Sequence, residues 1–286
     1  MDTTHWLRSA QEVRLPFIIY GTAWKKQATP RLVEQALRLG FRGIDTACQP
    51  RHYDEAGVGA GIAAALHEGL SREELYLQTK FTSLDGQDPN NIPYDPRVSL
   101  AVQVRQSCTA SLRNLRTTYL DCLVLHSPLP DMESTRQVWE AMAQLVDSGT
   151  VRQLGISNCY DLTTLESLYR SARIKPTIVQ NRYYARTGFD RGIRTFCLQH
   201  GMFYQSFWTL TANPRMLAHA TLRNLAGKYR VNAAQILFRY LNQVGVIPLT
   251  GTASALHMAE DLAICDFELQ PQERDSIAAL EEIPWR

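Results

Sequence analysis

The sequence predicts an α/β protein built as a single-domain (β/α)8 TIM barrel. Eight apolar, β-branched runs alternate with segments of helical pattern, and no repeat or Ser/Gly-rich linker divides residues 1–286. The eight predicted strands are residues 15–20, 41–45, 75–80, 120–126, 151–157, 177–181, 202–207 and 244–250. Eight strand–helix units in about 250 residues are typical of this barrel, whose chemistry lies at the C-terminal ends of its parallel strands.

An open, doubly wound sheet is the alternative architecture. That fold carries a Gly-x-Gly-x-x-Gly turn directly after its first strand, where the backbone approaches a dinucleotide. The nearest approximation in this chain, Gly57-Val-Gly59-Ala-Gly61, lies within a segment of helical pattern. The position of these glycines therefore favours the barrel.

The segments between the predicted strands carry signals for helix starts and stops. Thr29 caps the first helix, a proline follows at the first helical position, and Gly40 ends it. Residues 55–69 and 132–148 are predicted to be helices as well. Residues 71–74 have the spacing of a capping box that opens a short turn.

Two segments lie outside this alternation. Residues 83–96, rich in Asp, Asn and Pro, are predicted to be a loop inserted directly after the third strand. The chain also ends soon after its last predicted helix, so the C-terminal tail is short. The inserted loop either leaves the barrel mouth open or folds over it as a lid, and the sequence allows both arrangements.

Composition argues against several kinds of partner. A formal charge of +2, from 30 basic and 28 acidic residues, gives no electrostatic case for binding nucleic acid or a membrane surface. No run approaches the roughly 18 apolar residues that span a bilayer, and the first residues lack the pattern of a signal peptide. The six cysteines are scattered without CxxC spacing, which predicts reduced thiols in a cytoplasmic protein and no metal site. We expect a monomer or a weak homo-oligomer.

Ionisable residues follow three of the predicted strands. Asp45, Lys80 and His126 stand at strand ends, and Tyr53 comes shortly after the first of them. Each alone has an ordinary structural explanation, as a turn carboxylate, a solvated charge or a core histidine. Because parallel strand ends converge on one face, together they predict a proton-delivery site. In such a site a cation lowers the pKa of a phenol, a carboxylate holds the cation, and an imidazole orients a substrate oxygen.

Ordered motifs along nearly the whole chain resemble the signature of the aldo-keto reductases, in particular of microbial or fungal-type members. The matching motifs are Gly43-Ile-Asp45-Thr-Ala, Tyr53, Glu55, Gly57-Val-Gly59, Leu77-Gln-Thr-Lys80, Leu120-Asp-Cys-Leu-Val-Leu-His126-Ser-Pro, Gly155-Ile-Ser157-Asn158, Val179-Gln180-Asn181 and Asp266-Phe267-Glu-Leu269. Their common order is a stronger signal than any single motif.

The resemblance implies an NADP-dependent oxidoreductase that reduces an aldehyde or ketone, a small-molecule carbonyl substrate, to an alcohol. NADPH is the expected cofactor and NADH the alternative. The reaction needs a hydride at carbon and a proton at oxygen. Tyr53 is then the proton donor, and Asp45, Lys80 and His126 complete the catalytic set.

The resemblance also implies a cofactor site. Ser157, Asn158 and Gln180 match the trio that binds the nicotinamide carboxamide in the family. Phe207 or Trp208 stacks on the nicotinamide, and the choice between these two neighbours stays open. The other cofactor positions implied by the match are Gly21, Thr22, Asp45, Leu210, Thr250, Thr252, His257 and Asp261.

The chain departs from the family pattern at the cofactor phosphate. Relatives often carry a Lys-Ser pair and then an arginine for the 2′-phosphate, where this chain has Leu249, Thr250 and, further on, His257. We therefore expect a preference for NADPH that is weaker than the family's usual one.

The implied substrate residues are Trp24, Tyr53, His126, Ser127 and Trp208. Ser127 stands where relatives often have a tryptophan, and the short tail removes a lid that many relatives carry. We expect an open pocket that accepts bulky, largely apolar carbonyl compounds, with Tyr94 of the inserted loop as one further contact.

Two other functions remain as alternatives. The family includes nicotinamide-binding regulatory subunits with little turnover, which a turnover assay would separate from an enzyme. A metal-dependent barrel hydrolase needs His, Asp or Glu ligands at several strand ends, and only Asp45 and His126 qualify.

Overall fold

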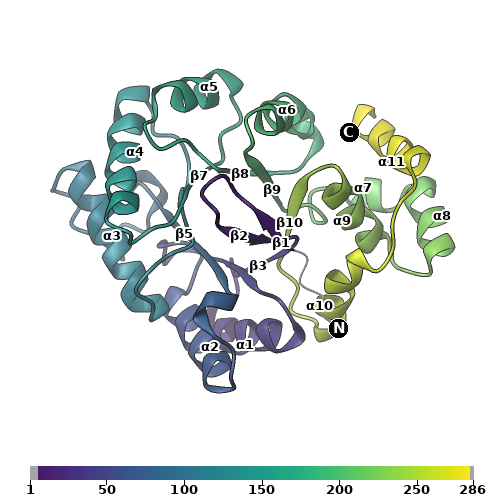
Figure 1. Ribbon diagram of the computed structural model, residues 1–286, viewed down its shortest axis with the longest axis horizontal. Coiled ribbons are helices and arrows are strands. Elements are labelled where there is room, and N and C mark those ends of the chain that lie inside the picture. The colour runs from purple at the N-terminus through teal and green to yellow at the C-terminus, as the bar shows by residue number, and fades with distance from the viewer. Residues whose placement is uncertain (1–5, 284–286) are drawn as a thin grey trace.

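The computed structural model describes residues 6–283, and at its centre eight parallel strands close into a barrel (Figure 1). The barrel strands are β3 (Ile19–Gly21), β4 (Gly43–Asp45), β5 (Tyr76–Phe81), β6 (Cys122–Leu125), β7 (Leu154–Ser157), β8 (Ile178–Arg182), β9 (Phe203–Phe207) and β10 (Val246–Thr250). They follow one another in chain order, and β10 pairs with β3 to complete the ring. The predicted barrel and its single domain are confirmed.

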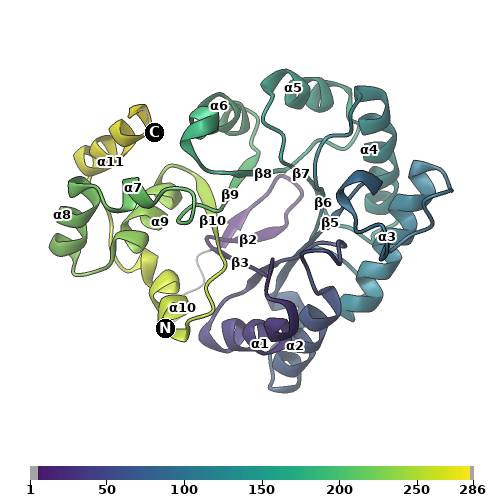
Figure 2. The ribbon, with the colours of Figure 1, turned by 180° about the vertical axis from the view of Figure 1, so that it is seen from behind.

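Helices surround the barrel on its outside (Figures 1 and 2). The α-helices are α1 (Thr29–Leu39), α2 (Glu55–His67), α3 (Leu100–Leu115), α4 (Met132–Asp147), α5 (Leu162–Ser171), α6 (Arg191–Gln199), α7 (Pro214–Leu217), α8 (Ala220–Tyr229), α9 (Ala233–Gln243), α10 (Ala255–Leu262) and α11 (Pro271–Ala278). Short 3₁₀ helices are η1 (Lys26–Ala28), η2 (Arg72–Glu74), η3 (Leu84–Gly86), η4 (Ala185–Asp190), η5 (Ala263–Cys265) and η6 (Ala279–Glu282). Within residues 6–283 no helix has the length and apolar character needed to cross a membrane.

The predicted first strand, residues 15–20, is wrong in its extent. Its first half belongs to β2 (Arg14–Pro16), which pairs with β1 (Trp6–Arg8) in an antiparallel hairpin, and only its second half enters the barrel as β3. The hairpin lies across one end of the barrel (Figure 1). Val13 and Leu15 pack there against apolar side chains at the starts of β5, β6 and β8, so the hairpin closes the N-terminal end. Pro16 ends the hairpin strand because it cannot donate a backbone hydrogen bond.

The glycines of α2 serve helix packing. A Cβ added at Gly59 would lie 2.0 Å from the carbonyl oxygen of Asn114 in α3, and one at Gly61 would lie 2.5 Å from that of Pro30 in α1. Both backbones therefore approach α2 more closely than any side chain would allow. This close packing accounts for a glycine-rich stretch inside a helix.

Residues 83–96 fold down against the barrel wall. The Tyr94 ring lies 5.7 Å from that of Phe81, and its hydroxyl donates to the Thr82 carbonyl at 2.8 Å. Gln87 Nε2 donates to the carbonyl of Cys48 at 2.9 Å. Through these contacts the segment supports the loops that follow β4 and β5, and Tyr94 is buried.

Candidate active site

A cavity of about 930 Å³ opens where the barrel strands end. Its lining comes from the loops after most of the strands and from α9 and α10. The volume lies at the upper end of the range for small-molecule sites. No residue of the segment 83–96 is among the lining residues, so the expected contact of Tyr94 with the pocket is wrong, and the segment does not form the alternative lid over the cavity.

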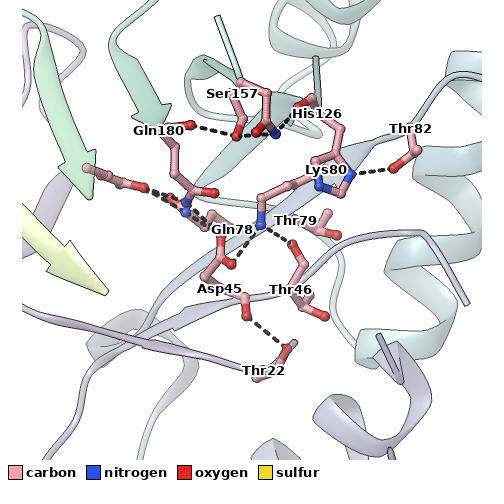
Figure 3. A network of polar contacts seen from close by, with 12 residues as sticks. Thr22, Asp45, Thr46, Gln78, Thr79, Lys80, Thr82, His126, Ser157 and Gln180 are labelled. Carbon is pink, nitrogen blue, oxygen red and sulfur yellow. Dashed lines mark hydrogen bonds and ion pairs between the residues drawn. The ribbon is translucent and has the colours of Figure 1, made fainter. Parts of the chain in front are cut away.

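Asp45 and Lys80 form a buried ion pair beneath this cavity (Figure 3). Lys80 Nζ lies 2.6 Å from Asp45 Oδ1 and 2.7 Å from Oδ2, and it also donates to the Thr46 carbonyl at 2.8 Å. These three acceptors use all three ammonium hydrogens. Parallel pairing of β4 with β5 brings the two strand ends together.

Tyr53 and His126 stand above the ion pair. Lys80 Nζ lies 5.2 Å from the centroid of the Tyr53 ring, and the centroids of the Tyr53 and His126 rings are 6.0 Å apart. Tyr53 is held just before α2, whose N-terminus is capped by Asp54 Oδ1 accepting from the Gly57 amide at 2.8 Å. The structure thus brings the four predicted catalytic residues into one cluster.

The pKa of Tyr53 moves opposite to the sequence-based expectation. Burial of the phenol raises its pKa, and the nearby Asp45 charge raises it further. Burial also lowers the pKa of Lys80, although the Asp45 carboxylate opposes that shift. The Tyr53 phenol therefore stays protonated at neutral pH, and Lys80 does not turn it into a phenolate in the absence of ligands.

His126 is neutral over the physiological range. Burial, with a smaller effect of the Lys80 charge, lowers its pKa to about 3. Its Nδ1 lies 2.7 Å from Thr82 Oγ1, and a dashed line marks this contact in Figure 3. Because Thr82 Oγ1 has no other acceptor within residues 6–283, we assign its hydroxyl as the donor to Nδ1, which leaves the imidazole proton on Nε2.

Glutamines inside the barrel hold the Asp45 carboxylate. Gln78 Nε2 and Gln180 Nε2 donate to Asp45 Oδ1 at 2.6 and 2.9 Å. Both also donate to Gln205 Oε1, at 2.8 and 2.9 Å. Neither Gln78 nor Gln205 was predicted from the sequence as a site residue. A polar side chain within a buried strand would have pointed to both residues. In addition, Gln78 lies two residues before Lys80, so the two side chains share one face of the strand.

The three residues predicted to bind the nicotinamide carboxamide all line the cavity. Ser157 Oγ donates to the Gln180 carbonyl at 2.6 Å, and Asn158 Nδ2 donates to the His126 carbonyl at 2.9 Å. Both amide hydrogens of Gln180 face the barrel interior, toward Asp45 and Gln205. Its Oε1 is thus the atom left to accept a hydrogen bond from a ligand.

Most other predicted site residues line the same cavity, namely Gly21, Trp24, Phe207, Trp208, Leu210, Thr250, Thr252, His257 and Asp261. Thr22 and Ser127 are not among the lining residues. Thr22 is buried and donates its hydroxyl to the Asp45 carbonyl at 2.9 Å, so it supports the site from behind. Ser127 lies two residues after the end of β6, and its side chain is partly buried.

The α10 end of the cavity carries acidic groups. Thr250 Oγ1 donates to Asp261 Oδ2 at 2.6 Å, and burial raises the pKa of this carboxyl to about 6. Glu260 lines the cavity beside it. Lys25, which the sequence analysis missed, contributes a cation here and donates to the Gly251 carbonyl.

Arg182 is a second missed cation in the lining. It ends β8 directly beside Phe207 of β9, and its guanidinium carbon lies 4.0 Å from the centroid of the Trp208 ring. The signal was its spacing of two from Gln180, which places both side chains on one face of the strand.

Three lining residues adopt left-handed backbone conformations that only glycine favours. Trp24, Asn158 and Trp208 have φ values of +64°, +51° and +56°. Such strain costs on the order of 1–3 kcal/mol per residue and gathers at functional sites. Within residues 6–283 no group of three or more His, Cys, Asp or Glu side chains is arranged to hold a metal ion.

Known proteins resemble this chain in sequence and in fold. A model described as the Aldo/keto reductase family matches residues 18–282. The uncharacterized oxidoreductase YtbE of Bacillus subtilis is 30% identical over 251 residues, which are 87% of this chain and 82% of that protein. The glyoxal reductase of Bacillus subtilis is 29% identical over 249 residues, with coverage of 87% and 82%.

A solved structure shows the same architecture. The aldo-keto reductase of Bombyx mori in complex with NADP superposes with a TM-score of 0.82 at 26% identity. The match covers 96% of this chain and 92% of that one.

Proposed function

Because this chain belongs to the aldo/keto reductase family, we propose that it reduces an aldehyde or ketone to an alcohol with NADPH, using Tyr53 as the proton donor. The observation that carries the proposal is the cluster of Tyr53 and His126 at the cavity wall above the Lys80–Asp45 ion pair. The dinucleotide complex of a relative supports the choice of cofactor.

The cavity offers suitable partners for a dinucleotide. Gln180 Oε1 is free to accept from a carboxamide at one end. At the other end Thr252 lies just ahead of α10, where backbone N–H groups and the helix dipole favour a phosphate. Lys25 adds a positive charge between the strand loops. A bound reduced nicotinamide would supply the hydride that goes to the carbonyl carbon.

The chain's own residues deliver the proton. The Nε2–H of neutral His126 donates a hydrogen bond to the carbonyl oxygen and holds it near Tyr53. As negative charge develops on that oxygen, the Tyr53 hydroxyl transfers its proton there, and the phenol recovers a proton from solvent. Lys80, fixed by Asp45, stabilises the transient phenolate by its charge. The raised pKa keeps Tyr53 at neutral pH in the protonated form that reduction needs.

The test is steady-state reduction of glyoxal and of an aryl aldehyde with NADPH and with NADH, in wild type and in Tyr53→Phe. We expect Tyr53→Phe to lower kcat by about 10²–10⁴-fold, the usual worth of general acid catalysis, while dinucleotide binding stays nearly intact. Lys80→Met should be similarly damaging. Glyoxal is included as a test substrate because one relative is named a glyoxal reductase.

Tyr119→Phe is the matched control. The buried Tyr119 hydroxyl has no hydrogen-bond partner among residues 6–283, and its ring contacts Arg72 and Arg152 away from the cavity lining. The control should keep wild-type kcat. A Tyr53→Phe enzyme with most of its kcat would overturn the assignment, and tight dinucleotide binding without turnover would favour a regulatory subunit.

A further inference from the structure

Arg182 brings to the cavity wall a positive charge that no described residue neutralises. Its guanidinium carbon lies 4.0 Å from the Trp208 ring centroid and 5.2 Å from that of Tyr184. Within residues 6–283 its side chain makes no ion pair, and its buried Nε has no hydrogen-bond partner. Protein side chains thus supply Arg182 with aromatic faces and no anion.

Hydrogen bonds place the backbone of Arg182 at the catalytic end of the cavity. The Arg182 amide donates to the Tyr160 hydroxyl at 3.2 Å, and that hydroxyl donates to Asn158 Oδ1 at 3.2 Å. Asn158 Nδ2 in turn donates to the His126 carbonyl at 2.9 Å. The backbone of Arg182 is therefore linked through hydrogen bonds to the backbone of His126. Thr252, which is proposed to lie near the cofactor phosphate, is at the α10 end of the cavity.

Among the described residues that line the cavity, no free carboxylate competes for Arg182 at this end. Asp45, the acidic residue of the lining here, is held by Lys80. The remaining acidic residues of the lining, Glu260 and Asp261, belong to α10. A guanidinium that stacks on an indole keeps the N–H donors of its edge free, and these match a carboxylate in a bidentate pair.

Flat aromatic groups also line the cavity. The Trp24 ring packs on that of His52 with 3.9 Å between the centroids and a tilt of 36° between the planes, and both residues line the cavity. Trp24 is 57% exposed and Trp208 is 47% exposed, so both present apolar surface to a ligand. The site thus combines apolar walls with one oriented cation.

We propose that Arg182 binds an anionic oxygen group of the substrate, so that the preferred substrates are carbonyl compounds that also carry a carboxylate. This inference rests on the proposed reduction, and it adds a substrate class to that reaction. Arg182 would be a substrate-binding residue, with no part in the hydride or proton transfer.

The experiment compares meta- and para-formylbenzoate and para-formylcinnamate with their methyl esters, which differ only in the negative charge. We expect wild type to favour at least one acid over its ester in kcat/KM by about 10- to 100-fold, the worth of a charged hydrogen bond, mainly through KM. Raising the salt concentration should lower the rate on the acid and leave that on the ester nearly unchanged.

Variants of Arg182 test whether this residue causes the preference for the acids over their esters. Arg182→Met should reduce the acid-to-ester ratio to near one, and Arg182→Lys should give an intermediate ratio because it keeps the charge and loses the planar fork. Arg186→Met is the matched control, since Arg186 is exposed and outside the cavity lining, and it should keep the wild-type ratio. Thermal melting confirms that each variant is folded.

The outcomes separate the inference from the proposed function. If wild type reduces both acids and esters but the ratio is near one, or survives in Arg182→Met, the inference fails and the reductase stands. If wild type reduces neither series with either dinucleotide, the proposed function fails and the inference with it. Should Arg182→Met not fold, the wild-type ratio and its salt dependence still decide.

Discussion

Thr82 sets which nitrogen of His126 carries the proton. Its hydroxyl lies 2.7 Å from Nδ1, so replacing it by a group of similar shape without a donor should free the imidazole to change tautomer. For Thr82→Val we expect kcat to fall about 3- to 10-fold, the worth of one neutral hydrogen bond. Dinucleotide affinity should not change.

Thr82→Ser is the control, because it restores the hydroxyl, and it should recover most of the lost kcat. Nitrogen NMR of the labelled imidazole reports the tautomer directly. Wild-type kcat in Thr82→Val would mean that another group fixes the tautomer of His126.

Asp261 links cofactor choice to pH. Burial raises its pKa from the usual value near 3.8 to about 6, so the carboxyl gains its charge as pH rises through that value. A charged Asp261 would repel a 2′-phosphate, the group that distinguishes NADPH, if that phosphate is held at the α10 end of the cavity. We expect the affinity ratio of NADPH over NADH to fall as pH rises, and to be small for this family at neutral pH.

Asp261→Asn should increase the affinity ratio of NADPH over NADH and make this ratio depend less on pH. Stability gives an independent reading, because a carboxyl with a raised folded-state pKa stabilises the fold below its unfolded pKa and loses that contribution as pH rises through the folded value. Asp261→Asn should therefore raise Tm by several degrees at about pH 8 and by little at about pH 4. A strong NADPH preference at all pH values in wild type would contradict this account.

Residues differ in how far the sequence alone could find them. Asp45 and Lys80 were predictable because a charge at the end of a buried strand is rare and needs a reason. Arg182 and Lys25 were missed because an arginine or lysine after a strand is usually a solvated charge. Only the structure shows that these two line the cavity.

At the scale of elements, helix ends were the most predictable features because their signals are local. The helix ended by Gly40 does end there, with φ of +121° at that glycine, although it begins one residue earlier than predicted, at Thr29, with Ala28 as the cap. The capping box of residues 71–74 is present in η2. Strand extents were less predictable, since the apolar run 15–20 does not reveal that two different sheets share it.

Two helix glycines should respond to alanine with opposite signs. In α2 a Cβ at Gly59 would meet the Asn114 carbonyl oxygen at 2.0 Å, so Gly59→Ala must push α3 away and should destabilise the fold by about 1–3 kcal/mol. In α8 a Cβ at Gly227 meets nothing within 4 Å. Gly227→Ala should therefore stabilise the fold by roughly 0.5–1 kcal/mol through helix propensity.

Urea unfolding of the two variants measures both changes. Each serves as the control for the other, since the substitution is the same and only the surroundings differ. If Gly59→Ala were as stable as wild type, α2 and α3 would have room to separate, and the close-packing explanation of the glycine-rich stretch would be wrong.

At the scale of the whole molecule, the barrel was predictable because alternation of strands and helices is a property of the entire chain. The arrangement of residues 83–96 was not, because a loop rich in Asp, Asn and Pro has the same composition whether it covers a site or not. In the structure Tyr94 packs on Phe81, so the segment lies against the barrel wall. Residues 83–96 therefore do not cover the barrel mouth, although they support the loops at its rim.

An open mouth predicts a preference for large substrates. The lining presents two indoles, Trp24 at 57% and Trp208 at 47% exposure, which a short aldehyde cannot cover together. Each 100 Å² of apolar surface that a larger ligand buries against them is worth roughly 2.5 kcal/mol, and binding energy of this kind also positions the carbonyl for reaction. We expect kcat/KM for an aryl or polycyclic ketone to exceed that for a short aliphatic aldehyde by at least about tenfold, after allowance for intrinsic reactivity. Trp24→Ala should narrow this gap by raising KM for the large substrate more than for the small one. A wild-type enzyme that works much better on the short aldehyde would mean that the mouth closes around small substrates in solution.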